Sequence, residues 1–130
     1  MRSLAIDDEF VVLSKMVAML ESFGQCDAAM TSRQALDLFR RALEEARPYD
    51  LVTIDINLPD MSGIMLLGRL NEEEGRRSAP RARKLMVTAE STMLNVLASA
   101  SADCDGFLAK PLRRAVLSEK LVDLGLLALF

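Results

Sequence analysis

The sequence predicts an α/β fold: a doubly wound, five-stranded parallel sheet with helices on both faces. Short apolar runs alternate with segments of helical periodicity five times along the 130-residue chain. Right-handed crossovers between parallel strands then place helices on both sides of the sheet. The length and the 51% hydrophobic content suit a single core, so we expect residues 1–130 to form one domain.

The first two strand–helix units occupy the N-terminal third of the chain. A short apolar run at residues 3–6 predicts the first strand, and a helix with Gly24 as its stop follows. The apolar stripe of that helix comprises Leu13, Met16, Val17, Leu20 and Phe23. Residues 25–30 are a weaker strand candidate. Ser32 is the expected N-cap of the next helix, and Pro48 closes it. Its stripe comprises Ala35, Leu36, Phe39, Ala42, Leu43 and Ala46.

The central unit is built around a dense apolar run at residues 51–56. Its β-branched content favours a buried strand, and its only acid is Asp55. A loop at residues 57–63 leads into a helix that we expect to end near Gly75. The apolar stripe of this helix comprises Ile64, Leu67 and Leu70. The basic residues at positions 76–84 are interpreted as a solvated loop.

The last two units complete the alternation. Strands are predicted at residues 85–88 and 107–109, and a helix at residues 91–100 separates them. The stripe of that helix comprises Met93, Leu94 and Leu97, and the final helix carries Leu117, Leu121, Leu124 and Leu127 or Ala128. The apolar segment 125–130 is compatible with packing on the domain, with a dimer contact and with the cut edge of a longer protein.

Composition excludes several classes of function. The net charge of −3 argues against a general nucleic-acid-binding surface. The absence of histidine excludes Ser-His-Asp and Cys-His catalysis and histidine-ligated metals. Cys26 and Cys104 lie far apart, which argues against a zinc site or a disulfide scaffold and favours a reducing cytoplasm. We expect no signal peptide and no membrane span.

Polar side chains gather where the predicted strands end, at the edge where such sheets bind ligands. Asp7 and Asp8 follow the first strand, Asp55 ends the third, Thr88 ends the fourth and Lys110 follows the fifth. Two carboxylates about 4 Å apart repel by roughly 4 kcal/mol, so the acids need raised pKa values or a bound cation. An all-oxygen site favours Mg²⁺. A carboxylate nucleophile, a metal, an amine and a hydroxyl are what phosphoryl transfer requires.

Each of these residues also has an ordinary structural interpretation. Asp7 or Asp8 could cap the first helix. Thr88 could be a plain strand residue and Lys110 a solvated charge. Asp55 is harder to explain in this way, because an unpaired carboxylate inside an apolar strand is costly. The agreement between the strand ends therefore carries more weight than any single residue.

The same residues resemble the response-regulator receiver family, the CheY-like domains of two-component signalling. The resemblance covers essentially the whole chain and rests on Asp7-Asp8, on the segment IDINLPDMSG that contains Asp55, on Thr88-Ala89 and on Lys110-Pro111. It implies the flavodoxin-like strand order 2-1-3-4-5. It also implies that Asp55 is the phosphoacceptor, supplied by the phosphohistidine of a sensor histidine kinase or a histidine phosphotransfer protein.

The resemblance further implies a metal site and a switch. Mg²⁺, or Mn²⁺, would be held by Asp8, Asp55 and the backbone carbonyl of Asn57, with Asp7 supporting it through water. Thr88 and Lys110 would bind the phosphoryl oxygens, and the Lys110–Pro111 bond would be cis. Phe107 matches the aromatic switch position. Its inward turn would bias the surface made by the fourth helix, fifth strand and fifth helix toward an output protein.

Several functional alternatives stay open. Asn57 and Glu90 occupy the positions that tune phosphoryl lifetime in this family, and we hypothesise a short-lived phosphoryl state. The chain could instead be a phosphate sink or relay, or an unphosphorylated pseudo-receiver scaffold, although the complete residue set argues against the last. A phosphatase with an aspartyl-phosphate intermediate would need a second aspartate where Asn57 stands. We therefore expect a cytoplasmic signalling domain, without an output domain of its own, rather than an enzyme.

Overall fold

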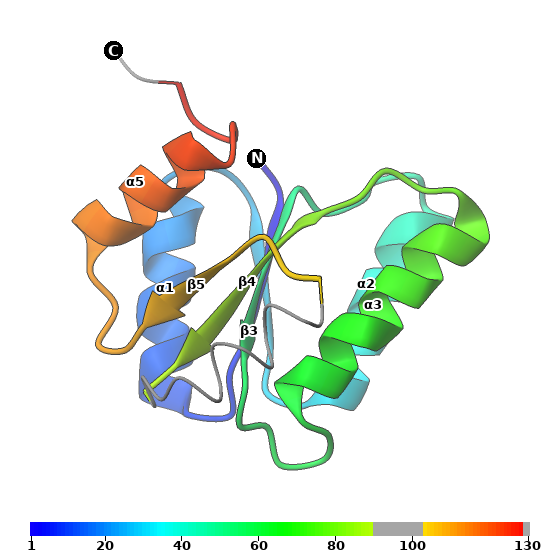
Figure 1. The fold of residues 1–130 in the computed structure, drawn as a ribbon, viewed down its shortest axis with the longest axis horizontal. Coiled ribbons are helices and arrows are strands. Elements are labelled where there is room, and N and C mark those ends of the chain that lie inside the picture. The colour runs from blue at the N-terminus through cyan, green and yellow to red at the C-terminus, as the bar shows by residue number, and fades with distance from the viewer. Residues whose placement is uncertain (90–102, 129–130) are drawn as a thin grey trace.

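The computed structural model describes residues 1–89 and 103–128 of the chain (Figure 1). Five parallel strands form one sheet in the order β2-β1-β3-β4-β5. The strands are β1 (Ser3–Ile6), β2 (Cys26–Ala29), β3 (Leu51–Asp55), β4 (Arg83–Thr88) and β5 (Gly106–Ala109). The predicted strand order is confirmed. The order reverses between β1 and β3, where a ligand site is expected beyond the carboxyl ends of these strands.

Helices cover both faces of the sheet, as predicted. Those described are α1 (Phe10–Glu21), α2 (Ser32–Glu44), α3 (Gly63–Arg77) and α5 (Arg114–Asp123). Figure 1 shows α1 and α5 on one side of the sheet and α2 and α3 on the other. The helix predicted at residues 91–100 lies outside the described residues. Within the described part of the chain, none of the helices is long and apolar enough to cross a lipid bilayer.

The core consists of two clusters, one on each face of the sheet. The cluster beneath α2 and α3 is centred on Phe39, Ile54, Leu67 and Leu70. The cluster beneath α1 and α5 is centred on Leu20, Leu51, Leu85, Leu117 and Leu121. Each buried side chain of this size contributes about 1.5–3 kcal/mol of transfer free energy. Most of the predicted helix stripes face these clusters, so the periodicity identified the core correctly.

Two predicted helix boundaries are wrong. The N-cap of α2 is Thr31 and not Ser32, because the extended backbone of Thr31 lets its hydroxyl accept a hydrogen bond from the Gln34 amide at 3.1 Å. Ser32 is instead the first helical residue, and its buried hydroxyl donates to the Met61 carbonyl. The second wrong boundary is the end of α1: this helix ends at Glu21, three residues before the predicted stop at Gly24.

The expectation for the basic segment after Gly75 is wrong in part: its four arginines are exposed, but its first residues are helical and Lys84 is buried. Helix α3 runs through Gly75 to Arg77, where Ser78 ends it in the left-handed conformation. Lys84 is not solvated but lies inside β4 with its side chain 0% exposed, paired with Glu74. A charge run is normally a solvated loop, and here a buried carboxylate on the preceding helix draws one of its members into the core.

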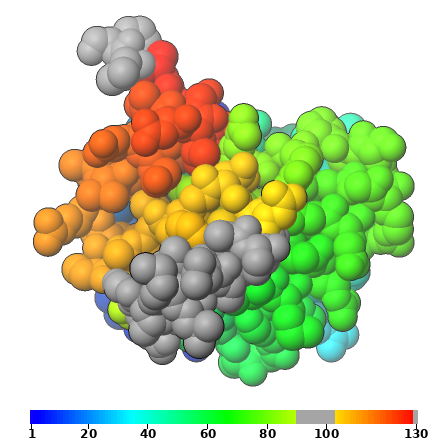
Figure 2. Space-filling view, in the orientation of Figure 1, coloured from blue at the N-terminus to red at the C-terminus, as the bar shows by residue number. Residues whose placement is uncertain are grey.

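The apolar C-terminal segment packs on the domain as far as it is described. Leu126 and Leu127 are partly buried against the cluster beneath α1 and α5. The Leu126 amide donates to the Leu121 carbonyl at 2.9 Å. In Figure 2 the residues after α5 lie at the top of the molecule, and in Figure 1 the strand arrows point to the opposite end. The segment is therefore remote from the predicted site.

Candidate functional site

Three carboxylates meet at the carboxyl ends of the two central strands. Asp7 and Asp8 follow β1, Asp55 ends β3, and these strands pair with Ile6 opposite Ile54. One oxygen from each carboxylate lies within 4.8 Å of the others. Asp7 and Asp55 are buried, with 5% and 3% of their surface exposed, whereas Asp8 faces solvent. The strand register thus builds the acidic cluster predicted from the sequence.

Lys110 enters this cluster from the loop after β5. Its Nζ lies 2.9 Å from Asp7 Oδ2 and 3.5 Å from Asp55 Oδ2. A third carboxylate, that of Glu9, lies 3.6 Å away. Burial lowers the pKa of Lys110, but the bond to Asp7 and the charge of Asp55 outweigh it and raise the pKa overall. Lys110 is therefore a fixed cation at neutral pH.

Glu9 was missed by the sequence analysis. It is the N-cap residue of α1, it is exposed, and its carboxylate faces Lys110 from the mouth of the site. The sequence did contain a signal for Glu9: it follows Asp7-Asp8 directly, so it adds a third negative charge at the same strand end.

Asp55 is the most perturbed acid in the cluster. Burial raises its pKa, and the neighbouring charge of Asp7 raises it further. Lys110 and the hydrogen bond from the Asn57 amide, at 3.3 Å to Asp55 Oδ1, oppose this rise. The pKa settles at about 6. A buried carboxylate beside other acids is electrostatically unfavourable, and a cation placed among them would relieve it.

Asp7 and Asp8 play different structural parts, and neither caps α1. Asp7 Oδ1 accepts a hydrogen bond from the Glu9 amide at 2.9 Å, and Asp7 Oδ2 pairs with Lys110. Both oxygens of Asp7 are thus engaged by the protein itself. The exposed Asp8 carboxylate lies beside Asp55 at the solvent-facing side of the cluster. This division favours direct metal ligation by Asp8 and Asp55, with a supporting role for Asp7.

Thr88 and Phe107 occupy neighbouring strands next to the acids. Thr88 is the buried last residue of β4, one residue beyond Val87, which pairs with Asp55. The Lys110 amide donates to the Thr88 carbonyl at 2.9 Å, and the Lys110–Pro111 bond is cis, as predicted. Phe107 lies on β5, half-buried against the cluster beneath α2 and α3. The switch motion assigned to Thr88 and Phe107 stays a prediction.

Of the two residues expected to tune phosphoryl lifetime, Asn57 lies within the described part of the chain. Asn57 is exposed, two residues beyond Asp55, with its amide held by that carboxylate. Glu90 lies outside the described residues. The short lifetime therefore stays a prediction.

Gly63 fixes the return of the acceptor loop toward β3. Its amide donates to the Ile56 carbonyl at 2.8 Å, and a Cβ atom at this position would collide with the backbone carbonyl of Asp55. A side chain here would push directly on the residue that carries the central carboxylate. Glycine is required by this close approach, and by no unusual φ angle.

We expect Gly63→Ala to destabilise the protein by about 1–3 kcal/mol, because the collision is with backbone and must be relieved by moving β3 or the loop. Urea denaturation followed by circular dichroism measures this. Gly75→Ala is the matched control in the same helix, since its added methyl group meets open space. It should stabilise by about 0.5–1 kcal/mol through helix propensity. Equal effects of the two variants would contradict the steric role of Gly63.

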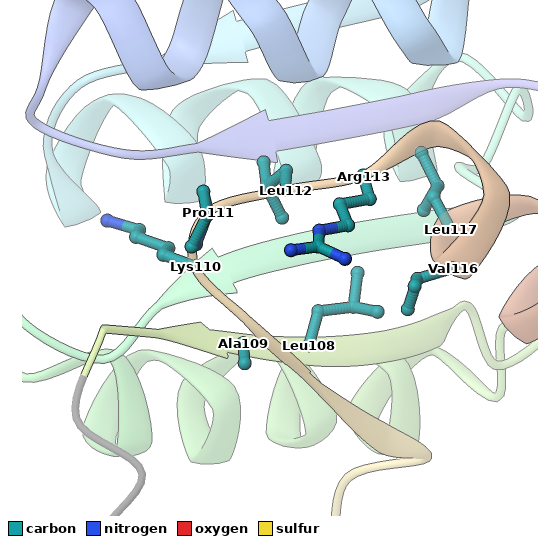
Figure 3. A pocket seen from close by; sticks show the side chains of 8 residues that line it. All are labelled: Leu108, Ala109, Lys110, Pro111, Leu112, Arg113, Val116 and Leu117. Atoms are coloured by element: carbon teal, nitrogen blue, oxygen red, sulfur yellow. The ribbon is translucent and has the colours of Figure 1, made fainter.

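A separate apolar groove borders the site between β5 and α5 (Figure 3). Its volume is about 260 Å³, and it is lined by Leu108, Ala109, Lys110, Pro111, Leu112, Arg113, Val116 and Leu117. In the close-up, the Arg113 side chain lies across the groove between Leu112 and Leu108. Lys110 thus belongs both to the acidic cluster and to the rim of this groove.

Comparison with known proteins gives a consistent family signal. The family model for the response regulator receiver domain matches residues 4–122. Chemotaxis protein CheY-3 of Vibrio cholerae serotype O1 is 31% identical over 124 residues, which cover 93% of this chain and 88% of that protein. Hybrid signal transduction histidine kinase L of Dictyostelium discoideum is 28% identical over 117 residues, covering 89% of this chain. The match spans only 7% of that kinase's length.

Solved structures agree with the sequence relatives. A CheY-like response regulator receiver domain protein from Methanospirillum hungatei has a TM-score of 0.79 and 28% identity, covering 94% of this chain and 90% of that one. A response regulator from Burkholderia pseudomallei, solved with a phosphorylated aspartic acid and a calcium ion, has a TM-score of 0.77 and 26% identity. It covers 92% of this chain and 65% of that one.

Proposed function

The chain belongs to the response regulator receiver domain family, and we propose that Asp55 is the residue on which it accepts a phosphoryl group. The donor would be the phosphohistidine of a histidine kinase or phosphotransfer protein. The observation that carries this proposal is a buried carboxylate of raised pKa, flanked by two further acids and held within 3.5 Å of a lysine ammonium. The domain is a signalling module and not an enzyme acting on a separate substrate.

The proposed reaction uses an oxygen of the ionised Asp55 as the nucleophile. It attacks the phosphorus in line with the phosphorus–nitrogen bond of the donor; that bond breaks, and its electron pair leaves on the imidazole ring. The product is an acyl phosphate on Asp55 and an unmodified donor histidine. Lys110, already 3.5 Å from Asp55 Oδ2, would pair with the phosphoryl oxygens, and Thr88 would hydrogen-bond to them.

The donor set at this site fits a hard divalent cation. All three clustered side chains offer carboxylate oxygens, and Lys110 offsets only one of their three negative charges. Asp8, Asp55 and the Asn57 carbonyl would hold Mg²⁺, or Mn²⁺, with Asp7 acting through water. Bound there, the ion would neutralise charge on the phosphoryl group during transfer. A relative that is 26% identical was solved with both a phosphorylated aspartic acid and a calcium ion.

The output of the domain would pass through Thr88 and Phe107. Drawing the Thr88 hydroxyl toward a phosphorylated Asp55 would vacate space beside β5, and Phe107 would turn inward to fill it. The surface of the fourth helix, β5 and α5 would then favour an output protein, and the alternative occupant of this surface is a second copy of the chain. Phe107 is half-buried against the core, which supports a position between two packing states.

Phosphorylation should depend on a divalent cation. We expect wild-type protein incubated with acetyl phosphate and Mg²⁺ to gain the mass of one phosphoryl group, and to gain none after EDTA treatment, because three acids would otherwise repel the anionic donor. Intact-mass spectrometry measures both conditions. Decay of the modified species within minutes would favour the short lifetime and the phosphate-sink function. No mass gain under either condition would support the pseudo-receiver alternative.

A further inference from the structure

An aspartate from the acceptor loop caps a helix that lies elsewhere in the sequence. Asp60 Oδ1 accepts a hydrogen bond from the Ser32 amide at 2.9 Å, and Asp60 Oδ2 accepts one from the Arg33 amide at 3.0 Å. These are the first two amides of α2, where the helix dipole favours negative charge. The two hydrogen bonds lower the pKa of Asp60, so its carboxylate is ionised at neutral pH.

The cap of α2 is divided between two segments of the chain. Thr31 serves the third amide, because its hydroxyl accepts from Gln34, and its carbonyl accepts the first hydrogen bond within the helix, from Ala35. Asp60 serves the first two. The amides of Ser32, Arg33 and Gln34, which lack a partner within the helix, therefore all have an acceptor. One of these three acceptors is local, and the other two are the carboxylate oxygens of a residue 28 positions away from Ser32 along the chain.

The Asp60 bonds anchor the middle of the loop that carries the proposed third metal ligand. The loop is fixed at its start by the Asn57 amide on Asp55 Oδ1, and at its end by the Gly63 amide on the Ile56 carbonyl. Between these points, Asp60 and the Ser32–Met61 hydrogen bond of 3.1 Å are its polar ties to α2. Releasing Asp60 would free the peptide units between Asn57 and Met61 without touching an acid of the cluster.

We infer that Asp60 is a positioning residue for the cation site, because its hydrogen bonds to the first turn of α2 hold the acceptor loop that carries the Asn57 carbonyl. This inference rests on the proposed metal ligation by Asn57. It assigns a functional role to a residue that touches neither the metal nor the phosphoryl group. It also couples α2 to the site: cation binding and the order of the first turn of α2 should support one another, since such coupling is reciprocal.

The alternative is that Asp60 merely stabilises α2, as any cap would. Thr31→Ala provides the matched control, because it removes the local hydrogen bond of the same cap and leaves the hydrogen bonds between Asp60 of the loop and α2 in place. Both Asp60→Ala and Thr31→Ala should lower the melting temperature. Only Asp60→Ala releases the loop, so the two explanations differ in their prediction for metal affinity.

The test is isothermal titration of Mg²⁺ into full-length wild type, Asp60→Ala, Asp60→Asn and Thr31→Ala. We expect Asp60→Ala to raise the Kd for Mg²⁺ about tenfold, as for other residues that orient metal ligands. Thr31→Ala should leave it within about twofold, since it unties nothing near the ligands. Asp60→Asn keeps one acceptor oxygen and should fall between them. Equal Kd values for Asp60→Ala and Thr31→Ala would overturn the inference.

Amide hydrogen exchange gives a second readout that a purely stabilising cap would not change. In wild type, Mg²⁺ should slow exchange at the Ser32 and Arg33 amides; in Asp60→Ala this slowing should be lost. A wild type whose α2 exchange is insensitive to Mg²⁺ would also overturn the inference. If wild type bound no Mg²⁺ at all, the proposed function itself would fail. If wild type bound Mg²⁺ but Asp60→Ala and Thr31→Ala had the same Kd for it, the positioning role of Asp60 would fail and the proposed function would stand.

Discussion

Asp55→Asn is expected to abolish phosphoryl acceptance and to make the metal-free domain more stable at neutral pH. The amide nitrogen and oxygen of asparagine are poor nucleophiles, so no acyl phosphate can form at position 55. The replacement is nearly isosteric, so the fold and the strand register should persist. A loss of activity together with a gain in stability distinguishes a strained functional residue from an ordinary structural one.

The gain in stability follows from the direction of the pKa shift. The pKa of Asp55 is raised from 3.8 to about 6, so the folded state favours the protonated carboxyl more than the unfolded state does. This contribution is fully present below about pH 4 and is lost as the pH rises through about 6. The shift corresponds to on the order of 3 kcal/mol. Asp55→Asn keeps a neutral side chain and should escape this loss.

Urea denaturation of EDTA-treated wild type and Asp55→Asn across this pH range measures the effect. The difference in unfolding free energy should be small below about pH 4, should grow in favour of the variant as the pH rises from about 4 to about 6, and should level off above that. Asp37→Asn, which neutralises an exposed acid on α2, is the control for general charge effects. A phosphorylated Asp55→Asn protein would refute the assignment of the acceptor. A flat pH dependence would refute the strain at Asp55.

The fold could be predicted from the sequence because its information is local. Each strand is a short apolar run and each described helix has a stripe at helical spacing, so alternation alone defined the class of the sheet. The acidic site followed because parallel strands end at the same edge. Asp7, Asp8, Asp55 and Lys110 needed only the topology to be brought together, and the structure places them in contact.

The interactions that could not be predicted depend on contacts between segments far apart in the chain. Asp60 follows a proline in a loop, and nothing near it in the sequence indicates that it caps α2. Lys84 stands in a basic run, where local reasoning favours solvent. Its burial is decided by Glu74, ten residues away on another element. A run of like charges therefore predicts solvent exposure only where no buried residue of opposite charge can pair with one of its members.

The buried ion pair between Lys84 and Glu74 should be the most sensitive point for stability. Lys84 is 0% and Glu74 2% exposed, with Nζ 2.5 Å from Oε1. Lys84 Nζ also donates to the Ala82 carbonyl at 3.0 Å, and the Ala82 amide donates to Glu74 Oε2 at 2.7 Å. The pair joins the end of α3 to the start of β4, remote from the acidic site. Removing either partner takes away the nearest opposite charge of the other, which stays buried.

Lys84→Met is therefore expected to lower the free energy of unfolding by about 3–5 kcal/mol, a large part of the stability of a domain this size. The double variant Lys84→Met, Glu74→Met replaces both charges by apolar side chains of similar length. It should recover much of the loss, because most of the cost comes from the unpaired buried carboxylate and not from the missing attraction.

Urea denaturation at neutral pH compares the single and double variants with wild type. Arg81→Met is the control, since the side chain of Arg81 is half exposed and its ion pairs with Glu74 and Asp103 are peripheral. A double variant as unstable as Lys84→Met would show that the pair itself, with its bonds to Ala82, stabilises the junction between α3 and β4.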